Sequence, residues 1–141
     1  MKKQRFALAL TLALPPVLCM SCGKKDQQSL YPVRGQVLYE GRPASRALVV
    51  FHPREAGASS AVRPHGQVGE DGSFTLGTHG SNDGAPAGQY RVTVQLYLSS
   101  GKGDEGPTNR LPARYANPEQ SGLKATVATG PTELKPFQLK R

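Results

Sequence analysis

Tryptophan is absent from this chain of 141 residues, methionine occurs only twice, and aromatic residues make up 6% of the sequence. Glycine and proline, in contrast, occur 16 and 12 times. This composition is unlike that of a helical bundle, and the length suits one domain rather than a multi-domain enzyme. The composition therefore favours a small all-β domain.

The sequence also lacks an apolar run of the roughly 20 residues that a transmembrane helix needs. The apolar segment at residues 6–18 is interrupted by Pro15 and Pro16 and follows three basic residues among the first five. A basic segment before a short apolar run is typical of a secretory signal peptide. We therefore expect the mature protein to be exported from the cytoplasm.

Cys19 and Cys22 are the only cysteines. Their C-x-x-C spacing occurs in redox and zinc sites, but these two lie where the apolar run ends, without the strand-to-helix context or further ligands that such sites need. Residues 18–23 instead resemble the lipobox of bacterial lipoproteins, in which a small residue, here Ser21, precedes the cysteine that is lipidated. The resemblance implies a signal peptide at residues 1–21 and lipidation of Cys22. The alternatives are a plain signal peptide and a free thiol.

The formal net charge of +8 overstates how basic the mature chain is. The whole chain has 18 basic and ten acidic residues, and removal of the three cations in the signal peptide leaves a net charge of +5. The remaining cations are scattered along the sequence, which indicates a mildly basic surface rather than a nucleic-acid-binding groove. We expect the membrane, through the lipid, to be the main partner, with an envelope protein or glycan as a further one.

Residues 22–30 are polar and aperiodic, as in a flexible tether, and we expect the folded domain to span residues 31–141. The clearest strand is residues 89–98, where apolar residues alternate with mostly polar ones. This period of two predicts that Val92 and Val94 are buried and that Thr93 faces water.

Turn residues divide the rest of the domain into short segments of similar pattern. Asp71 and Gly72 predict a two-residue hairpin, because both tolerate positive φ. About seven strands at this spacing predict an all-β fold, an antiparallel seven-stranded immunoglobulin/transthyretin-like β-sandwich. The expected strands are residues 33–39, 47–52, 68–70, 73–76, 89–98, 123–128 and 134–139.

The segment 99–122 is a long connection with no strand or helix pattern, and such a loop is either functional or held against the domain. Arg110, Arg114 and Tyr115 form a candidate loop binding site for an anionic glycan or a partner carboxylate.

The structural alternative for the same loop is that its two spaced apolar residues, Leu111 and Tyr115, pin it to the flank of the sandwich. Arg110 and Arg114 would then be solvated or would pair with Glu119.

No residue set predicts catalysis, a cofactor or a metal. His52, His65 and His79 are 13 and 14 residues apart, so no two have the short spacing of ligands on one element. No Gly-x-Ser-x-Gly motif is present, and the acidic residues lack the spacing of a calcium loop. We therefore assign no catalytic, cofactor-binding or metal-binding residue.

Several motifs together resemble the carboxypeptidase-regulatory-like domain, a transthyretin-like sandwich. V-x-G-x-V, G-x-P and A-x-V-x-F lie within residues 33–51, D-G-x-F-x-L at 71–76, and G-x-Y-x-V-x-V at 88–94. Residues 111–123 are similar to a segment of bacterial lipoproteins that carry this domain behind a lipobox. The resemblance implies a non-catalytic accessory module and supplies no peptidase residues.

These observations predict a non-catalytic, lipid-anchored protein of the cell envelope whose sandwich is a structural or binding module. A carbohydrate- or peptide-binding module that uses the 99–122 loop is the alternative. A transthyretin-like hydrolase is a third reading, but the Tyr-Arg-Gly-Ser ending of the hydroxyisourate hydrolases is absent from the C-terminus.

Overall fold

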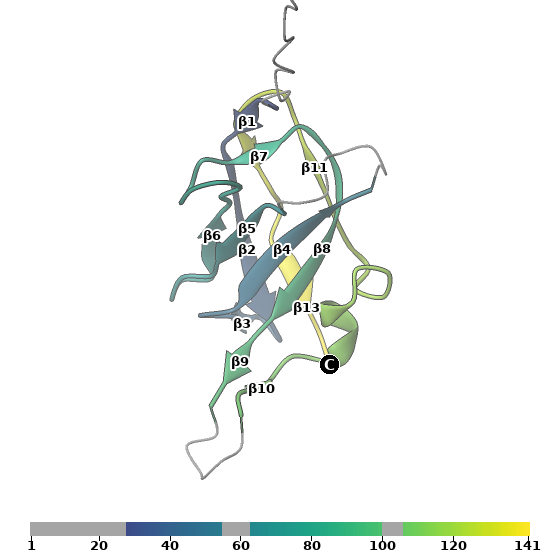
Figure 1. The fold of residues 1–141 in the computed structure, drawn as a ribbon. Coiled ribbons are helices and arrows are strands. Elements are labelled where there is room, and N and C mark those ends of the chain that lie inside the picture. The colour runs from purple at the N-terminus through teal and green to yellow at the C-terminus, as the bar shows by residue number, and fades with distance from the viewer. Residues whose placement is uncertain (1–27, 55–62, 100–105) are drawn as a thin grey trace, which may run out of the picture.

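The computed structural model describes residues 28–54, 63–99 and 106–141 (Figure 1). These residues form short strands and one 3-10 helix, so the predicted all-β sandwich is confirmed. Some expected strands are shorter or divided, and the strand expected at residues 68–70 is wrong, because β5 ends at Gln67 and residues 69–73 form a turn. The elements are β1 (Leu30–Tyr31), β2 (Val33–Tyr39), β3 (Arg42–Pro43), β4 (Leu48–Pro53), β5 (His65–Gln67), β6 (Ser73–Thr75), β7 (Ala85–Pro86), β8 (Gly88–Gln95), β9 (Tyr97–Leu98), β10 (Thr108–Asn109), η1 (Ala113–Ala116), β11 (Leu123–Val127), β12 (Thr132–Glu133) and β13 (Phe137–Leu139).

The first layer is an antiparallel sheet in the order β11-β8-β4-β5. The apolar segment expected to be central does form β4, which lies between β8 and β5. In the β4–β8 ladder Val49 is opposite Val94 and Phe51 is opposite Val92, so two pairs of core residues face each other across the strands. Cross-strand pairs of this kind stabilise a sheet through side-chain packing.

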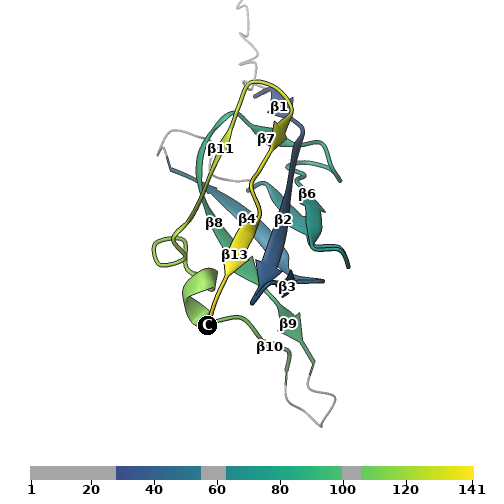
Figure 2. The ribbon, with the colours of Figure 1, turned by 180° about the vertical axis from the view of Figure 1, so that it is seen from behind.

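The second layer is organised around β2, and the prediction of a purely antiparallel sandwich is wrong here. β3 and β6 pair with β2 in antiparallel fashion, but β12 and β13 run parallel to it (Figure 2). The chain reaches β12 from β11 in the other layer, and this crossover returns it along β2 in the same direction. Pro136, which has no N–H to donate to a ladder, lies between β12 and β13 and accompanies the break between them.

The core lies between the two layers. Phe51 from the first sheet contacts Tyr90 and Phe74 with ring centroids 5.5 and 6.5 Å apart, and Phe74 stacks with Phe137 at 6.2 Å. Tilted and edge arrangements of this kind are favoured by the ring quadrupoles. The largest fully buried side chains are Phe51, Leu76, Leu139, Val33, Val37, Val49, Val92 and Val94.

Strand β8 confirms half of the predicted alternation. Val92 and Val94 are buried as expected, but Thr93 is also buried, with 2% of its surface exposed, so its predicted position in water is wrong. Its Oγ1 shares a hydrogen bond of 2.9 Å with Nε2 of His52 on the neighbouring strand β4. Burial and the nearby charge of Arg63 lower the pKa of His52. The outer face of this sheet is therefore partly covered by its own polar side chains.

The turn at Asp71 and Gly72 differs from the predicted two-residue hairpin. Gly72 N donates to Gly69 O at 3.0 Å, and Gly69 N donates to Ser73 O at 2.7 Å, so three residues form the loop. The flanking strands belong to different layers, because β5 pairs with β4 in one sheet and β6 pairs with β2 in the other. The turn is thus a corner between the layers.

The two ends of the sandwich carry different segments. β1 pairs with β7 at one end, while the two-stranded β9–β10 ribbon, η1 and the C-terminus lie at the other (Figures 1 and 2). Ordered pairing begins at Leu30, one residue before the predicted start of the domain. The predicted signal peptide and Cys22 lie outside the described residues. No helix in the described part of the chain is long and apolar enough to cross a membrane.

Candidate functional site

The loop that contains the predicted binding residues is packed against the domain. Its two expected apolar anchors, Leu111 and Tyr115, are buried, with 5% and 6% of their surfaces exposed. The loop was expected to lack regular structure, but it contains β10 and the 3-10 turn η1, which packs beside β8. Asn109 explains part of this order, because its Oδ1 accepts hydrogen bonds from the amides of Leu96 and Leu111.

Tyr115 joins the loop to the C-terminal strand. Its hydroxyl accepts a hydrogen bond from Lys140 N at 2.9 Å and donates one to Lys140 O at 3.1 Å. Arg114 also donates to Lys140 O, and its guanidinium lies 4.8 Å from the centre of the Tyr115 ring. Burial raises the pKa of Tyr115, but the Lys140 amide and the Arg114 charge outweigh it, so the net pKa is lowered. This cluster works as a clamp between η1 and β13.

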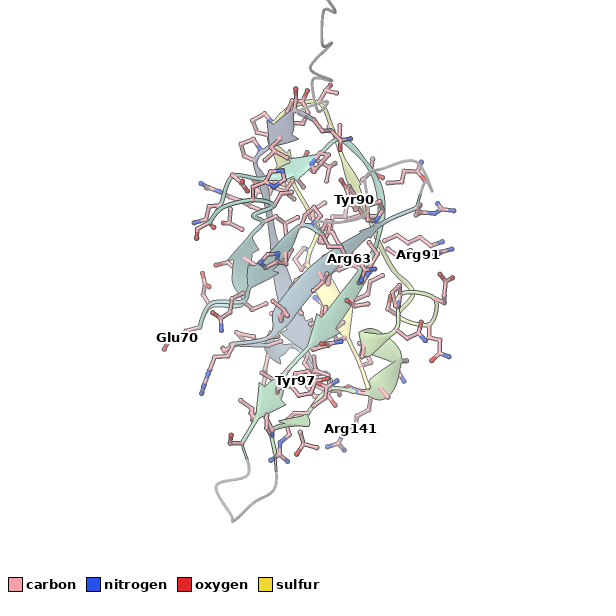
Figure 3. The ribbon with its side chains drawn as sticks, viewed as in Figure 1. Arg63, Glu70, Tyr90, Arg91, Tyr97 and Arg141 are labelled. Atoms are coloured by element: carbon pink, nitrogen blue, oxygen red, sulfur yellow. The ribbon has the colours of Figure 1, made fainter. Side chains whose placement is uncertain are left out.

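The three predicted site residues therefore do not form one open surface. Arg114 and Tyr115 are together but engaged in the clamp, whereas the Arg110 side chain is exposed and its backbone N–H donates to Leu96 O. Of the two expected alternatives for these arginines, solvation or pairing with Glu119, the pairing is wrong, because Glu119 forms a salt bridge with Arg91 on β8. Figure 3 labels Arg91. Tyr97, in β9, is the exposed aromatic side chain near this loop, with 54% of its surface exposed.

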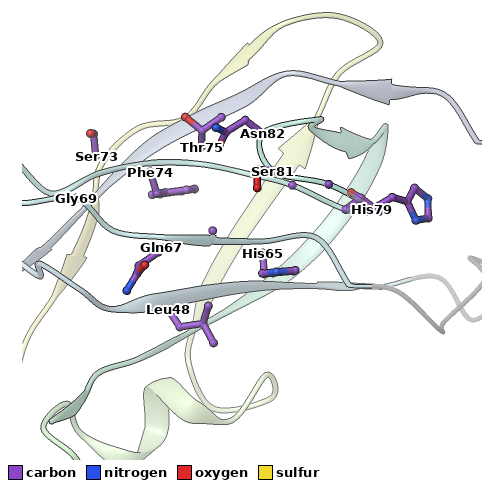
Figure 4. Close-up of a pocket in the computed structure, with 14 residues that line it drawn as sticks. Leu48, His65, Gln67, Gly69, Ser73, Phe74, Thr75, His79, Ser81 and Asn82 are labelled. Carbon is purple, nitrogen blue, oxygen red and sulfur yellow. The ribbon is translucent and has the colours of Figure 1, made fainter.

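A groove of about 1000 Å³ lies on the outer surface where β5 and β6 diverge (Figure 4). One wall comes from β4 and β5, and the other comes from β6 and the loop that follows it. The groove was not predicted from the sequence. Its lining residues are Leu48, His65, Gly66, Gln67, Gly69, Ser73, Phe74, Thr75, Gly77, Thr78, His79, Gly80, Ser81 and Asn82.

Glycines allow the two strands to come together at this corner. A Cβ on Gly66 would lie 2.4 Å from Thr75 O, and a Cβ on Gly77 would lie 2.1 Å from Gly80 O. Both distances are below any normal carbon–oxygen contact, so these positions exclude side chains as they stand. The cluster of glycines between residues 66 and 80 was the sequence signal for a close backbone approach. The sequence does not show which strands approach each other, because β5 and β6 belong to different sheets.

The loop that forms one wall of the groove is organised around the carboxylate of Asp83. Oδ1 accepts the amide of Thr78 at 2.6 Å, and Oδ2 accepts the amides of His79 and Gly80 at 3.0 and 2.8 Å. Partial burial acts to raise the pKa of Asp83, but these amides and the nearby His79 outweigh it, and the net pKa lies below the usual value. Asn82, at φ 63°, completes the tight turn. The wall is therefore fixed by its own backbone.

The polar groups of the groove come from both walls. Figure 4 shows His65 and Gln67 on one side and Thr75, Ser81 and Asn82 on the other. His65 Nδ1 lies 3.0 Å from the carbonyl of Arg63, which only accepts, so Nδ1 carries the proton in the neutral ring and Nε2 is an acceptor.

The three histidines occupy separate places. His52 is paired with Thr93 on the outer face of the first sheet, His65 lines the groove, and His79 lies at one end of it. Within the described segments, no group of three or more His, Cys, Asp or Glu side chains is placed to hold a metal ion.

No protein-family model and no curated protein sequence matches the chain. Among solved structures, a 9R-lipoxygenase from Cyanothece PCC8801 aligns with a TM-score of 0.44 and 15% identity, over 79% of this chain and 16% of that one. A DUF3823 family protein from Parabacteroides merdae ATCC 43184 aligns with a TM-score of 0.39 and 17% identity, over 80% of this chain and 46% of that one. The chain thus spans less than half the length of either protein, and both scores are below 0.5, so neither bears on family or function. Membership of the carboxypeptidase-regulatory-like family stays a prediction.

Proposed function

We propose that this protein is a non-catalytic, lipid-anchored protein of the cell envelope whose β-sandwich is a binding module. The lipobox-like segment that ends at Cys22 supports the anchor. The groove between β5 and β6 supports the binding role, because its polar groups converge from two walls on an open volume of about 1000 Å³. The groove is the observation that carries the binding role.

The arrangement of the sandwich suits attachment through its N-terminus. β1 lies at the end opposite the β9–β10 ribbon, so a lipid on Cys22 would place that ribbon away from the membrane (Figure 1). Seven residues lie between Cys22 and Leu30. The eight Cα-to-Cα steps that join the two would span about 27 Å if fully extended. Such a tether would leave the groove, on the side of the sandwich, accessible to envelope components.

A hydrolytic role receives less support from the same structure. The closest approach to a nucleophile and base among the described hydrogen bonds is the contact between Thr93 and His52. Thr93 is buried, with 2% of its surface exposed, so a substrate would not reach its hydroxyl without movement of β4 or β8. A binding module needs no such rearrangement.

The anchor is tested by expression of the full chain in a bacterium, followed by separation of membrane and soluble fractions and mass spectrometry of the mature N-terminus. We expect an acylated Cys22 at the N-terminus of a membrane-bound protein. Cys22→Ala should remove the acyl mass and either release the chain or leave its signal peptide uncleaved. Cys19→Ala is the matched control and should remain anchored. An unmodified N-terminus at another residue would refute the proposal.

A further inference from the structure

We propose that the groove between β5 and β6 binds a neutral oligosaccharide. The inference rests on the binding role proposed above and names the ligand class, but it does not depend on the lipid anchor. It follows from the charge of the groove, from its hydrogen-bonding groups and from the way its edges are closed.

The groove is free of permanent charge in a charged domain. The described residues include twelve Lys or Arg and six Asp or Glu, yet none of these lines the groove. Asp83, which shapes one wall, has its carboxylate directed to the loop amides of Thr78, His79 and Gly80. An anionic or cationic ligand would lose its hydration there without gaining an opposite charge. A neutral ligand avoids that cost.

The available polar groups match hydroxyls. Gln67 and Asn82 each offer an amide that can donate and accept, Thr75 and Ser81 offer hydroxyls, and Nε2 of His65 accepts in the neutral ring. A sugar presents several hydroxyls, each of which donates and accepts. Leu48, 40% exposed, lies on the same wall as His65 and Gln67 and supplies an apolar contact for the C–H face of a sugar ring.

The closed edges of the groove disfavour a peptide strand. One edge of β5 is paired with β4, and one edge of β6 is paired with β2. The facing edges are tied at both ends, by the two hydrogen bonds between His65 and Gly77 and by the bond from Gly69 N to Ser73 O. Addition of a strand to a sheet requires a free edge. A ligand must therefore lie across the outer surface of the groove and use side chains.

The walls are already in place for binding. The Asp83 carboxylate and the hydrogen bond of 2.6 Å from Thr78 Oγ1 to Gly84 O fix the loop that carries Ser81 and Asn82. A wall that is fixed before binding lowers the entropic cost of association. This rigidity suits a weakly hydrophobic, hydroxyl-rich ligand, which gains little from burial of apolar area.

The experiment uses the full-length protein in a detergent without a sugar headgroup. The protein is first applied to an array of neutral hexasaccharides, including cellohexaose, laminarihexaose, maltohexaose and hexa-N-acetylglucosamine, with hexagalacturonate and an array of extended peptides as contrasts. Binding of the best neutral sugar is then measured by titration calorimetry in 50 and 500 mM NaCl.

We expect a neutral hexasaccharide to bind with an affinity that changes less than about twofold between the two salt concentrations. Gln67→Ala and Asn82→Gly should each weaken binding about tenfold, because each removes an amide that bonds the ligand. Glycine is used at position 82 because it keeps the positive φ of that turn. Gln138→Ala, an exposed strand glutamine on β13, is the matched control and should bind like the parent protein.

Thermal melts keep these results interpretable, since Gln67 and Asn82 are exposed and neither variant should shift the melting temperature by more than a few degrees. Retention of no neutral sugar would overturn the inference, as would salt-sensitive binding of hexagalacturonate alone. Selective capture of extended peptides through Gln67 would overturn it in favour of a peptide site. Each of these failures leaves acylation of Cys22, measured separately, untouched.

Discussion

The 106–122 loop and the β5–β6 corner are both irregular, but one is closed and the other is open. The loop folds back on the sandwich because Leu111 and Tyr115 enter the buried space beside β8. The corner keeps a groove because glycines bring its strands together and small polar side chains line its walls. A buried aromatic side chain holds the loop against the domain. Glycines and small polar side chains leave an open groove at the corner.

The two regions also differ in how their polar groups are used. In the loop, Arg114 and the Tyr115 hydroxyl are engaged with the backbone of Lys140. In the corner, Asp83 accepts hydrogen bonds from the backbone of one wall, and Gln67 and Asn82 line the groove. The loop therefore stabilises the domain, and recognition is the role that we propose for the corner.

The largest effect should come from removal of the loop anchor. Tyr115→Ala should lower the free energy of unfolding by about 3–4 kcal/mol, because it leaves a cavity and removes a buried hydrogen-bonding group. Chemical denaturation measures this loss, and limited proteolysis should show new cleavage within residues 106–122. Tyr97→Ala, at the exposed tyrosine of β9, should change stability by no more than about 0.5 kcal/mol. Equal losses in the two variants would show that the loop is not pinned by Tyr115.

Closure of the glycine corner should have the next largest effect. Gly77→Ala places a Cβ against Gly80 O and 3.0 Å from Asn82 N, both backbone atoms. Since backbone must shift, we expect a loss of about 2–3 kcal/mol in denaturant titrations. Gly130→Ala, where a Cβ would meet nothing within 4 Å, should stay within about 0.5 kcal/mol of the parent. A stable Gly77→Ala protein would mean that the corner is less tightly packed than its distances indicate.

The contribution of Asp83 to the stability of the groove wall should depend on pH. Because the folded pKa lies below the ordinary value of 3.8, the ionised carboxylate stabilises the fold; its contribution is full above pH 3.8 and is lost as pH falls through the folded pKa. Asp83→Ala should cost about 1–2 kcal/mol at neutral pH, since three amides lose their acceptor. The difference between the two proteins should shrink below pH 3.8.

Asp71 also has a lowered pKa, but it is present in both proteins and so cancels from the Asp83 comparison. Thermal melts from pH 2.5 to pH 7 measure the difference directly. A difference that stays constant across this range would show that the carboxylate charge does not hold the loop.

The smallest change in stability should come from substitution of the two loop arginines, which should differ from each other. Arg114→Glu should destabilise the protein by about 1 kcal/mol, because the bond to Lys140 O and the contact with the Tyr115 ring are lost. Arg110→Glu should alter stability by less than about 0.5 kcal/mol, since its side chain is exposed. If either variant lost glycan binding while the groove stayed intact, the binding site would have to lie in the loop and not in the groove.

Several features of the fold were predictable from local sequence. Alternation of residue type along a strand predicted that Val92 and Val94 are buried, and the apolar run that became β4 predicted a central strand. The apolar pair Leu111 and Tyr115 likewise predicted a loop held against the domain. In each case the residues themselves carry the signal, because burial of an apolar side chain is favourable wherever the strand lies.

Other features depended on which strands meet. Thr93 is polar, and only its neighbour His52 across the β4–β8 ladder explains its burial. The Glu119 carboxylate forms its salt bridge with Arg91, 28 residues away in the sequence, and not with Arg114, which is nearer in the sequence. The first pairing is set by strand register, which is a property of the whole sheet. The second depends on where the loop after η1 lies beside β8.

The sequence by itself determined the all-β class, the alternation that builds the core and the turn residues that separate the strands. The tertiary structure alone decided that β12 and β13 run parallel to β2 and that β5 and β6 part into different layers. The physical reason is one of range. Side-chain pattern and turn conformation act over a few residues, whereas the groove exists because segments from β4, β5 and β6 and the loop after β6, brought together by two separate ladders, surround it.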